Sequence, residues 1–254
     1  MNKYIESLLG LSPATLIRGL RFGPREAQRA NRASCYLTQP FENRLLKEIP
    51  VTSIENILGA RKVSIKLYIM KYEDGMMPVR DALALLPILV AEQPKEILEI
   101  GTYMGHTSRL MAENVPDAIV HTIDLPPDFS ANLPQDVNLP KDDFHLIQRR
   151  IVGREFKNQD CESRIVQHFG DSAKLDFTKI GKPTFFFIDG SHTYEYCKLD
   201  SEKCFALGQG KGVFHWHDCD QTHPGVLRFI AEWRAAGRNI TRIDGTALAY
   251  WKSS

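Results

Sequence analysis

The chain has 254 residues, of which 43% are hydrophobic and 25% charged, a composition that excludes an intrinsically disordered protein. The net charge of +1 gives no general attraction to nucleic acid, and the most apolar run, Ala82–Ala91, is too short to span a bilayer, so we expect no nucleic-acid or membrane partner. Five cysteines without a C-x-x-C pair and the absence of a signal-peptide pattern predict a cytoplasmic protein.

Residues 1–83 are expected to form an irregular helical extension, in which Ser12 and Pro13 are residue types that start a helix. The extension mixes polar turns with short apolar segments. This pattern suits either a cap over the following domain or a surface that joins copies of the chain into a homo-oligomer. We therefore predict a domain boundary after residue 83, with a second domain over residues 84–254.

Strands and helices alternate through the second domain, which indicates a doubly wound, Rossmann-like α/β fold. The predicted helices are Thr107–Asn114, Thr193–Leu207 and Pro224–Ala236. The predicted strands are Glu96–Gly101, Ile119–Leu125, Arg164–Gly170, Thr184–Gly190 and Gly212–Asp218. Two further strands flank Asp244-Gly245 and predict a terminal antiparallel hairpin.

The segment 126–163 interrupts this alternation and carries four prolines: Pro126, Pro127, Pro134 and Pro140. A connection of this length in a compact domain is usually functional. We therefore predict a lid-like insertion, with a plain surface insertion as the alternative.

A glycine loop follows the first strand in "EILEIGTYMGHTS", with Gly101 and Gly105 as its glycines. A dinucleotide-binding loop carries a second glycine where the pyrophosphate approaches, but this chain has Tyr103 there. Glu99 adds a carboxylate that is unfavourable beside phosphate and favourable beside a cation. The loop therefore suits a ligand without phosphate and with positive charge, and S-adenosylmethionine fits this description.

Acidic residues at the next two strand ends support this ligand. Asp124 lies roughly 20 residues after the glycine loop, the position from which an acid accepts hydrogen bonds from ribose hydroxyls. Asp171 and Ser172 can pair with the edge of an adenine, although a helix cap would explain them too. Thr102 and Ser108 complete the candidate cofactor-binding residues.

Five segments together resemble the class I S-adenosylmethionine-dependent methyltransferases over about residues 84–251: "EILEIGTYMGHTS", "HTIDL", "GDSA", "FFFIDGSHTYEYCKLDSE" and "GVFHWHDCD" with "HPGV". The resemblance is greatest to methyltransferase family 24, which is close to macrocin-type sugar O-methyltransferases and cephalosporin hydroxylase-like proteins. It implies a seven-stranded sheet with a terminal antiparallel hairpin and the cofactor site described above, with Asp189 beside it.

The resemblance also implies a divalent cation, such as Mg²⁺, held by the acid of an I-D-G strand end and by an Asp-Asp pair after the next strand. The first acid is Asp189. The pair reads His217-Asp218 here, so an imidazole replaces one expected carboxylate. Asp189, His217 and Asp218 are thus the candidate metal ligands.

The candidate catalytic residues are Asp189, His192, His217 and Asp218, which follow the fourth and fifth predicted strands. An acceptor hydroxyl loses its proton either to a histidine base, His217 or His192, or through a bound cation. Other residues here have simpler explanations, which are packing for His215, Cys197 and Cys204 and helix initiation for His223. Trp216, Tyr194 and Tyr196 could stack on a sugar or another ring, but core packing explains them equally well.

We therefore predict an enzyme that transfers the methyl group of S-adenosylmethionine to a small hydroxylated acceptor, such as a sugar or a natural product. The alternative is a methyltransferase fold that binds the cofactor or a glycan without turnover, because a fold does not determine a function. Tyr103 argues against an NAD-dependent oxidoreductase.

Overall fold

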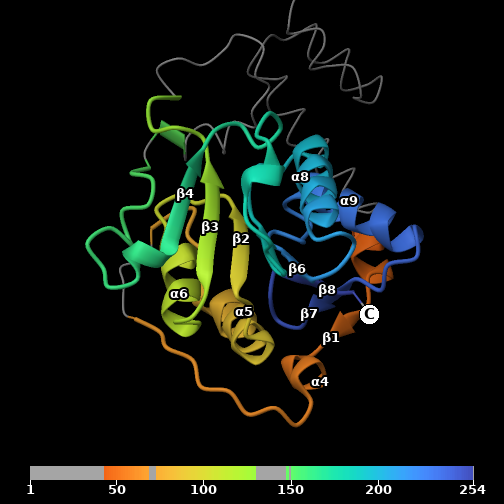
Figure 1. Cartoon of the computed structure of the whole chain (residues 1–254). Helices are drawn as coiled ribbons and strands as arrows, with labels where there is room; N and C mark the ends of the chain where they lie inside the picture. The colour runs from red at the N-terminus through yellow and green to blue at the C-terminus, as the bar shows by residue number, and fades with distance from the viewer. Residues whose placement is uncertain (1–42, 69–72, 130–146, 149, 254) are drawn as a thin grey trace, which may run out of the picture. The chain divides into compact units, whose positions relative to one another are not determined.

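The computed structural model describes residues 43–68, 73–129, 147, 148 and 150–253 (Figure 1). The chain divides into two compact units, Met1–Glu48 and Ile49–Ser254. The described part of the first unit, residues 43–48, is helical. Residues 1–42 of the predicted extension, with Ser12 and Pro13, lie outside the described residues, and so do residues 130–146 and 149 of the predicted insertion.

The division after Glu48 differs from the boundary that we predicted after residue 83. Strand β1 (Val51–Thr52) pairs in parallel with a strand near the C-terminus and thus belongs to the sheet. Helix α4 (Ile54–Leu58) follows, and helix α5 (Val79–Glu92) passes through the predicted boundary. One face of α5, which includes Leu85 and Leu89, is fully buried. Residues 49–83 therefore join the second unit because they extend its sheet and begin a core helix.

Eight strands form one sheet in the order β1-β7-β8-β6-β5-β2-β3-β4. The five central parallel strands are β2 (Glu96–Ile100), β3 (Ile119–Asp124), β4 (Ile165–Phe169), β5 (Phe185–Ile188) and β6 (Val213–Trp216). All four residues of β5 and of β6 are buried, as expected for parallel strands that are covered on both faces. The five predicted strands are confirmed.

The terminal hairpin is also confirmed. Strand β7 (Thr241–Ile243) pairs antiparallel with β8 (Ala249–Lys252), and β8 pairs antiparallel with β6. The doubly wound sheet thus has its seven predicted strands, and β1 adds a two-residue strand beside β7.

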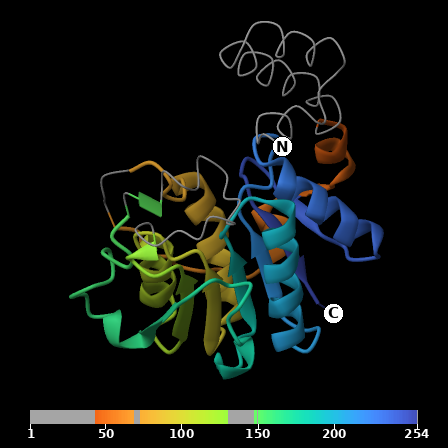
Figure 2. The ribbon, with the colours of Figure 1, turned by 90° about the horizontal axis from the view of Figure 1, so that it is seen from above.

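Helices cover both faces of the sheet (Figures 1 and 2). Helices α5 and α6 (His106–Asn114) pack on one face in a cluster that includes Phe185 and Phe187 of β5. On the other face, α8 (Tyr194–Leu207) places Phe205 against Phe214, and α9 (Pro224–Ala235) places Trp233 against Trp216. The three predicted helices are confirmed. In the part of the chain that the structure describes, no helix is both long and apolar enough to cross a membrane.

Two helix starts direct the chain past the carboxyl edge of the sheet. Thr193 caps α8, because its hydroxyl accepts a hydrogen bond from the Tyr196 N–H at 3.3 Å. Pro224 occupies the first turn of α9, where its missing N–H costs nothing. The loops before these helices carry the residues that follow β5 and β6. In such sheets ligands bind outside the carboxyl ends of the strands.

Candidate active site

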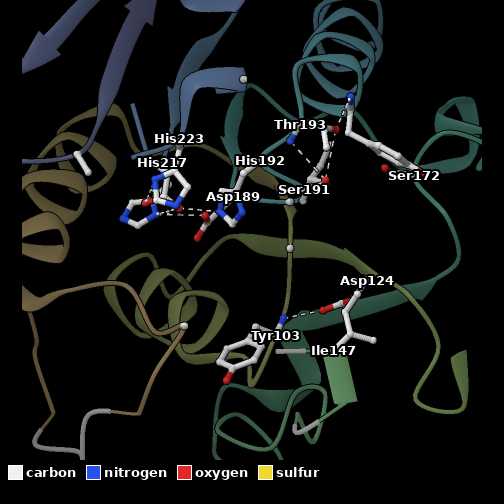
Figure 3. A pocket seen from close by; sticks show the side chains of 18 of the residues that line it. Tyr103, Asp124, Ile147, Ser172, Asp189, Ser191, His192, Thr193, His217 and His223 are labelled. Carbon is white, nitrogen blue, oxygen red and sulfur yellow. Dashed lines mark hydrogen bonds and ion pairs between the residues drawn. The ribbon is translucent and has the colours of Figure 1, made fainter. Parts of the chain in front are cut away.

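A cavity of about 990 Å³ lies at the carboxyl ends of the central strands. Residues at or just after the carboxyl ends of β2, β3, β4, β5 and β6 line it, including Gly101, Asp124, Asp171, Asp189 and His217. Figure 3 shows Tyr103 and Asp124 at one end and a cluster of histidines with Asp189 at another. The sheet thus brings together side chains that are far apart in the sequence.

The glycine loop passes very close to the end of β5. Gly101 has φ +101°, and a Cβ atom added to it would lie 1.9 Å from the carbonyl oxygen of Asp189. Tyr103 also has a positive φ, +49°, which turns its backbone N–H toward Asp124. That N–H donates to Asp124 Oδ2 at 2.7 Å. The loop is therefore tied to both neighbouring strand ends.

The Asp124 carboxylate has further partners. Its Oδ1 atom accepts a hydrogen bond from the Leu125 N–H at 2.7 Å and lies 3.0 Å from Arg150 Nη2. Burial raises the pKa of Asp124, and the nearby Arg150 charge and the backbone N–H groups offset part of that effect. Sequence reasoning missed Arg150, because it lies in the long segment whose path the strand and helix pattern does not specify.

Glu99 lies beneath the loop, with no exposed surface, and does not line the cavity that the described residues form. Its Oε2 atom accepts hydrogen bonds from the hydroxyls of Ser108 and of Thr122, the latter at 2.6 Å. Burial raises the pKa of Glu99 to about 8. The carboxyl group is therefore mostly protonated at neutral pH, so our interpretation of Glu99 as an anion beside a cationic ligand does not fit this environment.

We expect Glu99→Gln to weaken the pH dependence of stability. The folded state binds the Glu99 proton with a pKa of about 8, against an ordinary value of 4.5, so its contribution is complete at low pH and is lost as the pH rises toward 8. Wild-type stability should thus fall by several kcal/mol more than that of the variant between about pH 5 and about pH 8. Urea unfolding across this range measures it, with Glu202→Gln on the exposed face of α8 as the control. Parallel curves for wild type and Glu99→Gln would contradict the assignment.

Three other predicted cofactor-binding residues also support the loop from below. Thr102, Gly105 and Ser108 do not line the cavity as the described residues define it. The Thr102 hydroxyl pairs with that of Thr122 at 2.7 Å, and Ser108 has no exposed surface. A Cβ atom on Gly105 would lie 2.5 Å from the Phe156 ring. These residues shape the loop through packing and hydrogen bonds.

Asp171 and Ser172 follow β4 and line the cavity, as predicted. Asp171 Oδ1 accepts a hydrogen bond from the Ala173 N–H at 2.9 Å and from the Tyr196 hydroxyl at 3.2 Å. The first bond is the local turn that the capping alternative describes. The second bond connects the end of β4 to α8. Burial raises the pKa of Tyr196, and the Asp171 carboxylate raises it further, to about 12.

His217 follows β6 and is surrounded by carboxylates. Its Nδ1 atom lies 3.2 Å from Asp189 Oδ1 and 3.2 Å from Asp218 Oδ2. Its Nε2 atom lies 3.0 Å from Oδ2 of Asp81, on α5. Burial alone would lower the pKa of His217, but these three carboxylates outweigh burial and raise that pKa well above its ordinary value.

Asp218 is the centre of a second group. Its Oδ2 atom lies 2.7 Å from His192 Nε2, and its Oδ1 atom lies 3.5 Å from His223 Nδ1. The two imidazole rings are 4.5 Å apart (Figure 3). Burial would raise the pKa of Asp218, but hydrogen bonds from His192 and His217 hold it well below its ordinary value. Asp218 has φ +56°, a left-handed conformation that Asp tolerates better than most residues.

The simpler explanations hold for several neighbours. His215 is buried and stacks on Phe185 at 4.9 Å. Trp216 is buried and donates its ring N–H to the Ser201 hydroxyl at 2.8 Å. Cys197 and Cys204 are buried and free. His223, in contrast, is the N-cap of α9 without a capping hydrogen bond from its side chain, and it turns toward Asp218 and Asp220.

Residues 98–219 match the family model Methyltransf_24, which describes a methyltransferase domain. The chain carries a methyltransferase domain. This match confirms the predicted resemblance, and it extends from the middle of β2 past the end of β6 with every candidate catalytic residue.

The methyltransferase is similar to solved structures of the same fold. One is a methyltransferase from Podospora anserina with bound S-adenosylhomocysteine, which is 17% identical with a TM-score of 0.53 over 71% of this chain and 81% of that chain. Another is an O-methyltransferase from Bacillus cereus, also with S-adenosylhomocysteine, which is 15% identical with a TM-score of 0.48 over 83% of this chain and 91% of that chain. The first similarity confirms the Rossmann-like fold.

The sequence patterns did not identify Asp81 as a residue of the site in this methyltransferase. It lies in the first turn of α5, outside the segment that matches the family model, and its side chain has no exposed surface. The one available signal was an acid next to the most apolar run of the chain. Only its approach to His217, 136 positions away in the sequence, gives that acid a partner.

Proposed function

We propose that this methyltransferase transfers the methyl group of S-adenosylmethionine to a hydroxyl group of a small hydroxylated molecule, such as a sugar or a natural product. The observation that carries this proposal is the convergence of two groups in one cavity. One contains Gly101, Asp124 and Asp171. The other contains His192 and Asp218, which could activate an acceptor.

The first group suits the cofactor. Asp124 ends β3 in the position from which an acid receives ribose hydroxyls, and it is held there by two backbone N–H groups. Asp171 and Ser172 follow the neighbouring strand β4, within reach of an adenine. The similar Podospora anserina methyltransferase was solved with S-adenosylhomocysteine, which supports the same cofactor here.

The donor set of Asp189, His217 and Asp218 fits a divalent cation. Their ligand atoms lie within 4.8 Å of one another. Two of the distances, from His217 Nδ1 to each carboxylate, are 3.2 Å, close to the separation of about 3 Å between adjacent ligands of a small octahedral ion. A cation here would bind acceptor oxygens and lower the pKa of the attacking hydroxyl. One nitrogen among oxygens allows Mg²⁺ or Mn²⁺.

His192 is the residue that we propose as the general base. Both ring nitrogens of His217 face carboxylates, which favour its protonated form and make it unsuited to accept a proton. His192 pairs through Nε2 with Asp218, an arrangement that orients an imidazole and stabilises the charge it gains. We therefore propose His192, and not His217, as the general base, and His217 remains a candidate metal ligand.

Release of S-adenosylhomocysteine tests this function, with a panel of monosaccharides, nucleotide sugars and phenols and with Mg²⁺ or Mn²⁺ present. EDTA should abolish transfer, and the added metal should restore it. His192→Asn should lower the transfer rate by about 10²–10⁴-fold with unchanged cofactor affinity. His168→Asn is the matched control, because His168 pairs with His121 at 3.1 Å outside the cavity. Cofactor binding without transfer to any acceptor would favour the non-catalytic alternative.

A further inference from the structure

Asp81 is fully buried at the edge of the proposed cation site. Its Oδ2 atom lies 3.0 Å from His217 Nε2, and its Oδ1 atom accepts a hydrogen bond from the Ala247 N–H at 3.4 Å. Its backbone belongs to α5, whereas His217 follows β6 and Ala247 precedes β8. Three separate parts of the chain therefore meet at one carboxylate.

The two oxygens of Asp81 face different partners, and this determines what His217 can do. A carboxylate can only accept hydrogen bonds, so His217 must carry its proton on Nε2 to satisfy Oδ2. A cation that binds beside Nδ1 displaces the second proton of the imidazolium, and the lone pair then lies on Nδ1, the atom that lies 3.2 Å from both Asp189 and Asp218. Nδ1 is thus directed toward the candidate cation with the lone pair that a ligand needs.

We propose that Asp81 is the positioning residue of the cation site: it fixes the tautomer and the ring orientation of His217 and places a negative charge behind the imidazole. The proposal rests on the cation site proposed above. Ligand histidines commonly donate their second N–H to a carboxylate, which increases their affinity for the metal. Asp81 and His217 together replace the carboxylate that the expected Asp-Asp pair would supply.

A role only in helix stability does not account for this placement. An acid in the first turn of a helix is favourable for that helix alone. Such a residue is usually exposed, whereas the Asp81 side chain has no exposed surface and contacts groups from two other elements. Arg80, beside it, is 66% exposed and pairs with Asp81 Oδ1 at 3.4 Å, so it leaves Oδ2 to His217.

Calorimetric titration of the metal-free full chain with Mn²⁺ tests the proposal through Asp81→Asn. If the asparagine carbonyl accepts the Ala247 N–H, its NH₂ group faces His217 and moves the imidazole proton to Nδ1. We expect Mn²⁺ affinity to fall by about 10–100-fold. Asp117→Asn, at a surface pair with Lys95 where the acid is 78% exposed, should leave the affinity unchanged.

A double-mutant cycle separates positioning from a structural role. In a His217→Asp background no imidazole remains for Asp81 to orient, so Asp81→Asn should cost no Mn²⁺ affinity there. An equal loss in both backgrounds, or no loss in the wild-type background, would overturn the proposal. Absence of Mn²⁺ binding by the wild-type chain would overturn the cation site itself, and Asp81 with it.

A measurement on the unaltered protein covers the case in which Asp81→Asn fails to fold. In the Mg²⁺-loaded chain with ¹⁵N-labelled histidine, the His217 signal should show a proton on Nε2 and none on Nδ1. His217→Asn identifies that signal. A proton on Nδ1 in the loaded protein would overturn the proposal.

Discussion

Replacement of Gly101 by valine should abolish S-adenosylmethionine binding. A Cβ atom at this position would lie 1.9 Å from the carbonyl oxygen of Asp189 and 2.6 Å from its carbonyl carbon. Neither backbone atom can move alone, because the Asp189 N–H is bonded to the Ile100 carbonyl at 2.8 Å. The loop must therefore move away from the end of β5. This movement would displace Tyr103 from the cavity wall and disturb its hydrogen bond to Asp124. Titration calorimetry with S-adenosylmethionine and S-adenosylhomocysteine measures this loss.

Gly237→Val is the matched control for backbone strain. Gly237 has φ +94°, close to the +101° of Gly101, but no described atom lies within 4 Å of its added Cβ. Both variants place valine in a left-handed conformation, which costs about 1–2 kcal/mol. Gly237→Val should therefore lose some stability and bind both ligands as the wild type does. Retained cofactor binding by a folded Gly101→Val would show that the loop does not hold the cofactor.

Asp218→Asn should remove both the proposed cation binding and methyl transfer. The carboxylate lies within 3.5 Å of three imidazoles, those of His192, His217 and His223, so its loss leaves all three without their shared anion. Asparagine is the suitable replacement, because it tolerates the φ of +56° as well as aspartate does. Its effect thus reports the charge and not the backbone.

We expect the transfer rate of Asp218→Asn to fall by at least about 100-fold, since it removes the partner of the base and one proposed ligand together. Mn²⁺ affinity should fall with it, whereas S-adenosylmethionine affinity should change little. The release of S-adenosylhomocysteine and calorimetric titration check these points, with Asp117→Asn as the control. Full activity in a folded Asp218→Asn would place proton removal elsewhere in the cavity.

Local patterns were sufficient to predict the α/β architecture. Continuous apolar runs such as "FFFI" identify strands that are buried on both faces, and Asp244-Gly245 identifies the hairpin. The same patterns indicated which residues end the strands, and parallel strands bring their carboxyl ends to one edge. For this reason Asp124, Asp171, Asp189, His192, His217 and Asp218 could be predicted to lie around one site, and all line the cavity.

Residue types at the strand ends therefore determined the candidate site, whereas tertiary contacts decided the chemical state of each group. Complete burial raises the pKa of Glu99 to about 8, although the hydrogen bonds from Ser108 and Thr122 oppose this shift, and so favours a neutral carboxyl group that supports the loop. The pattern also could not assign Asp81 or Arg150, because their partners are distant in sequence and meet them only in the folded chain. The free energy of a proton on His217 depends on Asp218, its neighbour in the sequence, and on Asp81 and Asp189, which other parts of the chain bring within 3.2 Å.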